Sequence, residues 1–162
     1  MRRLLLVLAG LLLLAGCGQA AIPAGGSGGI GDTLHFDTME GASVDVTVLD
    51  TKRLPAAGDY RPELYGVKLR LEAVGEGVYR DAIGNCCVLL FGTDQQLEAE
   101  IAVLADDGFS MLGGQFGLVN IMAGDAREGW VYFALDEGIP AKALQFTADS
   151  GWGEDSGKWS LE

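Results

Sequence analysis

The 162-residue chain has few of the side chains that bind metals or act as catalytic bases. It contains one histidine, His35, and three cysteines, Cys17, Cys86 and Cys87. A zinc or copper site usually needs about three or four thiolate or imidazole ligands together, and no histidine lies near the cysteines. His35 falls on the polar phase of a predicted first strand, which indicates a surface residue, and nothing arranges a serine and an acid around it as a triad. We therefore expect no enzyme, no metal and no cofactor.

Basic residues are also scarce. The chain has 11 Lys and Arg against 23 Asp and Glu, and its formal net charge at pH 7 is -12. Nucleic acids and anionic lipid headgroups are bound by basic patches, so this charge predicts no nucleic-acid partner and no docking on headgroups. An acidic surface of this kind mainly maintains solubility.

Long apolar runs are missing after the N-terminus. The run Leu4–Leu14 follows the basic start Met1–Arg3 and is too short for a membrane-spanning helix, which needs about 20 apolar residues. A short basic start and a run of this length are typical of a secretory signal peptide, which we place at residues 1–16. No later run is long enough to span a bilayer, so we expect the protein to be anchored to a membrane rather than to cross it.

The residues that end this run, Leu14-Ala15-Gly16-Cys17, resemble the bacterial lipobox. The resemblance implies that Cys17 carries a diacylglycerol through a thioether and becomes the mature N-terminus. An ordinary secretory signal with a chance cysteine is the alternative. Acyl chains on one cysteine hold a soluble domain at a membrane. The predicted location is the extracytoplasmic face of the cell membrane in a Gram-positive, actinobacterial type of cell, although Gly18 leaves an outer membrane open for a Gram-negative source.

Residues 17–31 are predicted to be the lipidated cysteine and a flexible, glycine-rich tether, since 18–31 contain no charge. Two enzyme motifs occur there by chance. Gly25–Gly29 fits the hydrolase pattern G-x-S-x-G, and Gly26–Gly31 fits the dinucleotide pattern G-x-G-x-x-G. Both chemistries require a strand before the glycines and a helix after them, which a tether does not supply.

From residue 32 to 162 the apolar residues alternate with period two, which predicts strands with one buried face. Val44, Val46 and Val48 show this alternation clearly. Glycine-rich and acidic turn signals separate the runs, and no helical period is convincing. The fold class is therefore all-β, an immunoglobulin-like β-sandwich of about seven to nine strands. The clearest predicted strands are 43–50, 64–74, 97–104, 130–135, 143–147 and 158–162.

The order of these features resembles a family of bacterial lipoproteins with an immunoglobulin-like, telokin-like domain of unknown function. The resemblance rests on Gly31-Asp32-Thr33 before the first strand, and on the turn Ala123-Gly124-Asp125 before Gly129–Phe133. Pro140 and Trp159 follow in the expected places. The family has no established catalytic residues, so the resemblance implies a non-catalytic extracytoplasmic domain.

The adjacent pair Cys86-Cys87 leaves two alternatives open. Exported proteins meet an oxidising environment, where cysteines usually pair. Neighbouring residues of a strand point to opposite faces, so a vicinal disulfide would need a break in the strand, which Gly84-Asn85 could supply. Two reduced thiols fit the sequence equally well. A strained vicinal bond would be easily reduced, which suggests a redox-active envelope protein as an alternative function.

Partner contacts are expected in two loops, 106–117 and 149–158. Trp152 is the best candidate for an exposed aromatic contact, whereas Trp130 and Trp159 are predicted to be core residues. Phe109 and Phe116 lie in an apolar, glycine-rich stretch that forms either a partner patch or a segment closing the sandwich. The favoured function is a membrane-anchored binding module for another envelope protein or a small ligand, and a purely structural envelope protein is the third option.

Overall fold

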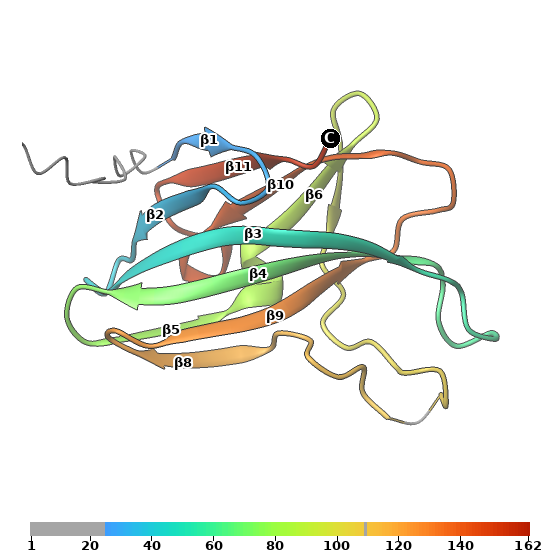
Figure 1. Ribbon diagram of the computed structural model, residues 1–162, viewed down its shortest axis with the longest axis horizontal. Coiled ribbons are helices and arrows are strands. Elements are labelled where there is room, and N and C mark those ends of the chain that lie inside the picture. Colours follow the sequence, from blue (N-terminus) through green and yellow to red (C-terminus); the bar gives the residue numbers. More distant parts are fainter. Residues whose placement is uncertain (1–24, 109) are drawn as a thin grey trace, which may run out of the picture.

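The computed structural model describes residues 25–108 and 110–162. Predictions for Cys17, for the signal peptide, for most of the tether and for Phe109 lie outside the described residues. The described chain is almost entirely β-structure (Figure 1). Its elements are β1 (Ser27–Gly28), β2 (Thr33–Asp37), β3 (Ser43–Leu54), β4 (Leu64–Val74), β5 (Val78–Ala82), α1 (Ile83–Cys86), β6 (Cys87–Phe91), β7 (Gln95–Glu98), β8 (Leu118–Met122), β9 (Ala126–Phe133), β10 (Ala141–Thr147), the 3-10 turn η1 (Asp149–Gly151) and β11 (Ser156–Ser160).

One layer of the sandwich is a four-stranded sheet in the order β2-β3-β4-β9. All neighbouring strands in it are antiparallel. The long β3–β4 pair runs from Ser43 opposite Val74 to Leu54 opposite Leu64, as the alternation predicts. On the outer face, His35 Nδ1 and Asp45 Oδ1 lie 2.7 Å apart across β2 and β3. This hydrogen bond raises the pKa of His35. The half-exposed histidine is therefore a cross-strand partner of Asp45.

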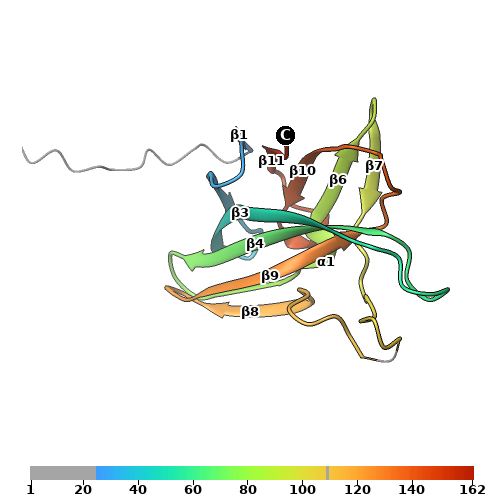
Figure 2. The same ribbon diagram turned by 45° about the vertical axis from the view of Figure 1, so that its right-hand side comes forward.

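The other layer contains a five-stranded sheet in the order β1-β11-β10-β6-β7 and the separate two-stranded ribbon β5-β8. β1 pairs with β11 in parallel, and the other neighbours are antiparallel. Figures 1 and 2 show α1 between β5 and β6, where the chain passes from the ribbon to the larger sheet. The arrangement confirms an all-β sandwich.

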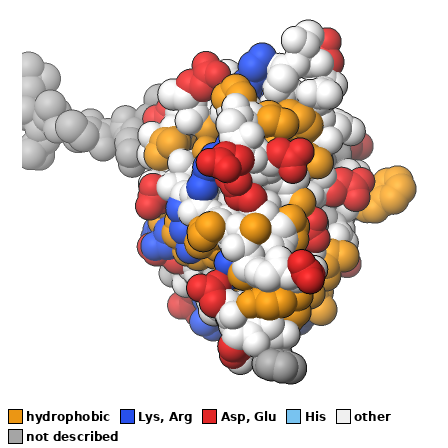
Figure 3. All heavy atoms as spheres, turned by 90° about the vertical axis from the view of Figure 1, so that its right-hand side faces the viewer, with side chains coloured by type: hydrophobic (Ala, Val, Ile, Leu, Met, Phe, Trp, Pro, Cys, Tyr) orange, Lys and Arg blue, Asp and Glu red, His pale blue; other side chains and the backbone are white. Residues whose placement is uncertain are grey.

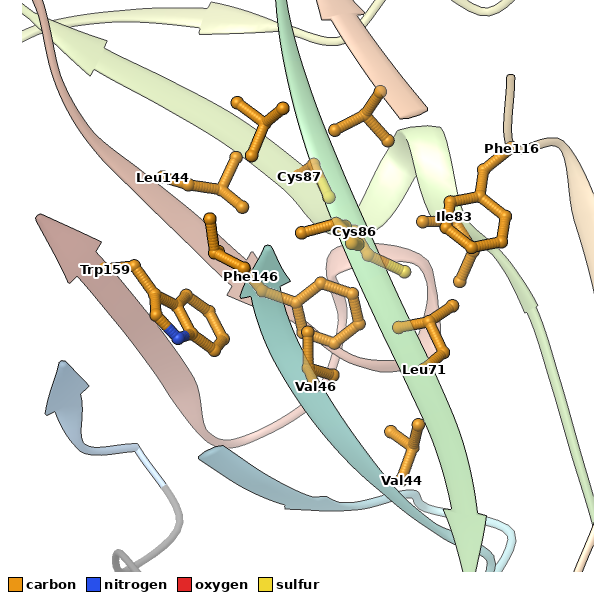
Figure 4. Packing of buried hydrophobic residues seen from close by; sticks show 14 of the residues in the cluster. Val44, Val46, Leu71, Ile83, Cys86, Cys87, Phe116, Leu144, Phe146 and Trp159 are labelled. Carbon is orange, nitrogen blue, oxygen red and sulfur yellow. The ribbon is translucent and has the colours of Figure 1, made fainter. Parts of the chain in front are cut away.

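The core lies between the two layers (Figure 4). Val46 of β3 and Leu71 of β4 face Phe146 of β10, and all three are fully buried. Trp159 of β11 is also fully buried, with its ring centroid 6.1 Å from that of Phe36. The alternation in the sequence identified these faces correctly, because β3 and β4 direct alternate side chains into the core along most of their length.

A second, smaller cluster lies on the outer face of β4 and β9. Leu64, Val103 and Tyr132 are its buried members, and Trp130 is only half buried against it. The segment between β7 and β8 covers these residues. Gly129 of β9 faces the main core on the other side of the sheet, where a Cβ would stand 2.9 Å from the ring of Phe116.

Three expectations need correction. The predicted strand 97–104 is wrong beyond Glu98, where β7 ends, and Ile101 is 79% exposed because the chain leaves the sheet there. Phe116, proposed as a partner contact, is buried in the main core. Strand pairing begins at Ser27, five residues before the expected boundary at 32, because β1 pairs with β11.

Candidate ligand pocket beside the two cysteines

The single turn of helix α1 positions Cys86 and Cys87. Cys86 ends α1, and Cys87 begins β6 with extended backbone. Both are free thiols and both are buried in the main core, as Figure 4 shows. Cys86 Sγ lies 3.5 Å from the carbonyl oxygen of Ala82, to which it donates a weak hydrogen bond. The break in the strand that a vicinal disulfide would need is present at Gly84-Asn85 as a helical turn, and the two cysteines are unbonded in the structure.

The surroundings of the thiols oppose nucleophilic chemistry. Burial raises the pKa of Cys86 and that of Cys87, and the charge of the nearby Asp81 raises both further. A thiol reacts as its thiolate, and a raised pKa together with burial suppresses that form. In this state of the molecule the pair has the character of small apolar core residues.

Asp81 of β5 is the centre of a buried hydrogen-bond network. Its side chain is 6% exposed and accepts a hydrogen bond from the Tyr79 hydroxyl at 3.0 Å. It also accepts one from the backbone N–H of Ser150 at 2.8 Å and one from the Ser150 hydroxyl at 2.7 Å. The backbone N–H of Ala82 donates to the same carboxylate. A buried carboxylate is tolerated when its acceptor sites are filled in this way.

The network fixes η1 in a strained conformation. Asp149 and Ser150 have φ of 55° and 53°, in the left-handed region that non-glycine residues rarely adopt. Gly151 follows with φ of 87°, and a Cβ there would lie 3.0 Å from the carbonyl oxygen of Asn85. Strain of this kind persists only where the surroundings hold it. The bonds to Asp81 therefore hold η1 against the end of β5, directly before α1.

A pocket of about 240 Å³ lies where η1 and α1 meet the edge of the five-stranded sheet. Its walls come from α1, the start of β6, the end of the edge strand β7, the segment that follows β7, and η1, which the Asp81 network holds. Glu98 supplies the only carboxylate among the lining residues, and no Lys, Arg or His lines the pocket. The lining residues that carry side chains are Asn85, Cys87, Val88, Glu98, Ala99, Ile101 and Ser150.

Chemically, the pocket offers an acidic group, hydrogen-bonding groups and an apolar wall. Glu98 supplies negative charge, Asn85 and Ser150 supply hydrogen-bond donors and acceptors, and Ala99 and Ile101 are apolar. The wider surface is acidic too, and Figure 3 shows Asp and Glu side chains spread among apolar ones over one end of the molecule. The negative charge of Glu98 and of the surrounding surface favours binding of a cation over binding of an anion.

Only some of the contact residues predicted from the sequence lie at this pocket. Trp152 is 80% exposed, as expected, and lies one residue after η1. Cys87 lines the pocket, and Cys86 lies beneath it in the core. In the described part of loop 106–117, Phe116 is buried. The Gln115 side-chain amide donates a hydrogen bond to the carbonyl oxygen of Glu100 at 2.8 Å, which fixes this segment against the one after β7.

Sequence reasoning missed Asp81, Ser150 and Glu98. Asp81 sits on an inward-facing strand position, where an acid is rare unless it is hydrogen-bonded. That position was a usable signal, but β5 was not among the clearest predicted strands. Ser150 and Glu98 reach the pocket only through the packing of distant segments, for which the sequence has no local signal.

Within the described residues, no group of three or more His, Cys, Asp or Glu side chains is placed to hold a metal ion. No helix in the same part of the chain is long and apolar enough to cross a membrane.

Solved structures of several bacterial proteins share this fold. The secreted protein MPT63 of Mycobacterium tuberculosis superposes with a TM-score of 0.60 at 16% identity, covering 88% of this chain and 99% of that one. The yjhA protein of Bacillus subtilis gives 0.59 at 15% identity, covering 83% and 99%. The putative lipoprotein ycdA of Bacillus subtilis gives 0.56 at 16% identity, covering 74% of this chain but only 36% of that one.

These likenesses define the class of fold, an all-β sandwich shared with those proteins, and at such identities they define nothing further. No protein-family model matches the chain, and no curated protein matches it.

Proposed function

We propose that the protein is a non-catalytic binding module on the extracytoplasmic face of a bacterial membrane, anchored by lipid on Cys17, and that its pocket binds a small cationic molecule. The observation that carries the binding role is the pocket itself. Glu98 is its only ionisable group besides the suppressed Cys87 thiol, and no basic side chain lines it. Its walls are fixed by the bonds between Asp81 and Ser150.

The proposed location is supported by the sequence and by the proteins that share the fold. Leu14-Ala15-Gly16-Cys17 ends an apolar run of signal-peptide length. Two similar folds belong to a secreted protein and to a putative lipoprotein. The same features support a distant relationship to the immunoglobulin-like, telokin-like lipoprotein family.

Lipidation is tested by growing cells that export the protein with a clickable palmitate analogue. We expect the label on the wild-type chain and its loss in Cys17→Ser, because acyl chains are carried only through that sulfur and the new N-terminus. Cys87→Ser is the matched control and should keep the label, since its thiol is buried. A labelled Cys17→Ser chain, or an unlabelled wild type, would remove the anchor from the proposal.

The size and chemistry of the pocket limit the ligand. A volume of about 240 Å³ is small for a ligand cavity, and cavities for drug-sized ligands usually measure about 300–1,000 Å³. A compact amine or quaternary ammonium ion fits, with its charge toward Glu98 and its carbon atoms toward Ala99 and Ile101. Asn85 and Ser150 would then hydrogen-bond polar groups of the ligand.

The binding role is tested by calorimetric titration with ethanolamine, choline and putrescine at low salt, with acetate as an anionic control. We expect at least one cation to bind and Glu98→Gln to weaken its binding about two- to fivefold, which is the effect of one exposed charge pair. Glu100→Gln removes a neighbouring exposed carboxylate outside the pocket and should leave the affinity unchanged. If no cation binds, or if both variants weaken binding equally, the pocket is not the site and a protein partner or a structural role takes its place.

A further inference from the structure

Strand β8 has an edge that no other described strand covers. Figures 1 and 2 both show β8 at the border of the molecule, with no helix or strand beyond its outer side, and Figure 1 shows β5 on its inner side. β8 pairs only with β5, as the separate two-stranded ribbon. The strand edges of a sheet are sites of pairing with another chain unless charge, proline or a covering segment protects them.

The register of the ribbon shows which backbone groups are free. Ile83 N–H donates to the Gly117 carbonyl, and Ala123 N–H donates to the Gly77 carbonyl. Bonded and non-bonded pairs alternate in an antiparallel ladder, so Asn120 opposite Arg80 is a non-bonded position. The N–H and C=O groups of Leu118 and Asn120 therefore point away from β5, and no described residue bonds them.

The side chains of this edge are apolar and uncharged. Leu118 is 85% exposed and Met122 is 58% exposed, on the same face as Asn120. The five residues of β8 contain no charge and no proline, in a chain whose net charge is -12. The usual protections of an edge strand are absent at this position, although carboxylates cover much of the remaining surface.

The sequence of β8, Leu-Val-Asn-Ile-Met, has a symmetric pattern about Asn120. If a second copy pairs antiparallel across a two-fold axis at Asn120, Leu118 lies opposite Met122 of the partner subunit. The outward N–H and C=O groups of Asn120 then meet those of the partner's Asn120. A two-fold interface requires this self-complementarity, and a neutral strand avoids repulsion between two acidic chains.

We propose that β8 is a dimerisation edge, at which two copies of this chain join their β5-β8 ribbons into one four-stranded sheet. This contact is independent of the pocket, which lies against α1 and β7. If the protein is membrane-anchored, confinement to one surface raises the effective concentration of copies and strengthens a short interface.

Oxidative cross-linking of the full-length protein in the cell envelope tests the contact. In the proposed dimer the Cα atoms of the two Asn120 residues are about 5.5 Å apart, which a disulfide can span. The matched control is Arg80→Cys on β5, exposed on the same face. Its two copies would be about 14 Å apart, three strand spacings, which a disulfide cannot span.

We expect Asn120→Cys to give at least fivefold more covalent dimer than Arg80→Cys on a non-reducing gel. Adding Leu118→Glu and Met122→Glu to Asn120→Cys should reduce the dimer to the control level, because carboxylates then face one another across the axis. Both side chains are exposed, so these changes leave the core intact. Equal dimer from both cysteine variants, or none from either, would overturn the proposal. A covalent product of a different mass would also overturn it, because another protein would then occupy the edge.

Discussion

Trp159→Ala is expected to lower the free energy of unfolding by about 4 kcal/mol. The side chain is fully buried in β11, and large-to-small changes of a buried tryptophan cost about 3–5 kcal/mol through lost contacts and the cavity that remains. Its indole N–H also donates to the carbonyl oxygen of Asp32 at 2.9 Å, so the variant leaves that acceptor without its partner. Since small domains are stable by about 5–15 kcal/mol, this loss is a large fraction of the total stability.

The measurement is urea unfolding followed by far-UV circular dichroism, because the substitution also removes a fluorophore. Trp152→Ala is the matched control and should change stability by less than about 0.5 kcal/mol, since that tryptophan is 80% exposed. Trp159→Phe keeps most of the ring and should lose only about 1–2 kcal/mol. If Trp152→Ala destabilised the protein as much as Trp159→Ala, the assignment of core and surface tryptophans would be wrong.

Asp81→Ala is the second large effect, with an expected loss of about 3 kcal/mol. The substitution leaves the Tyr79 hydroxyl and the N–H and hydroxyl of Ser150 without their acceptor. Each buried polar group left unsatisfied costs about 1–3 kcal/mol. Burial raises the pKa of Tyr79, so its hydroxyl stays protonated and becomes an unpaired donor in the variant.

The same variant should release η1. Ser150 holds its left-handed φ of 53° through bonds to Asp81, so hydrogen exchange at the amides of Ser150 and Gly151 should accelerate while β3 and β4 stay protected. Glu137→Ala, at an exposed position, is the control and should leave both measurements unchanged. Unchanged stability in Asp81→Ala would mean that the network does not support the pocket wall.

The sequence predicted the regular strands well and the irregular segments poorly. The β3–β4 pair follows the alternation at 43–50 and 64–74, since each strand has one buried and one polar face. The run at 97–104 shows the same alternation, yet only its start is a strand. Beyond Glu98 the chain leaves the sheet, and Val103 is buried in the smaller cluster instead. Periodicity reports which side chains alternate, and tertiary packing decides whether a neighbouring strand is available.

The aromatic residues show the same division. Trp159 in the core and Trp152 at the surface were predicted from their neighbours, because one lies in an alternating strand and the other in a glycine-rich loop. Phe116 was placed with the surface candidates because its surroundings are glycine-rich. It is buried because Gly129 lets its ring approach β9.

By itself the sequence determined the all-β class, the main strand faces, the acidic charge and the prediction of a lipid anchor at Cys17. These depend on composition and on local periodicity, which need no knowledge of distant contacts. Only the tertiary structure decided the rest. It brought Ser150 into hydrogen-bonding distance of Asp81, 69 positions earlier in the sequence. It also brought Glu98 to the pocket and left the edge of β8 uncovered. The physical reason is that hydrogen bonds and close packing between segments far apart in the chain form only when the whole sandwich is assembled, and no local pattern encodes them.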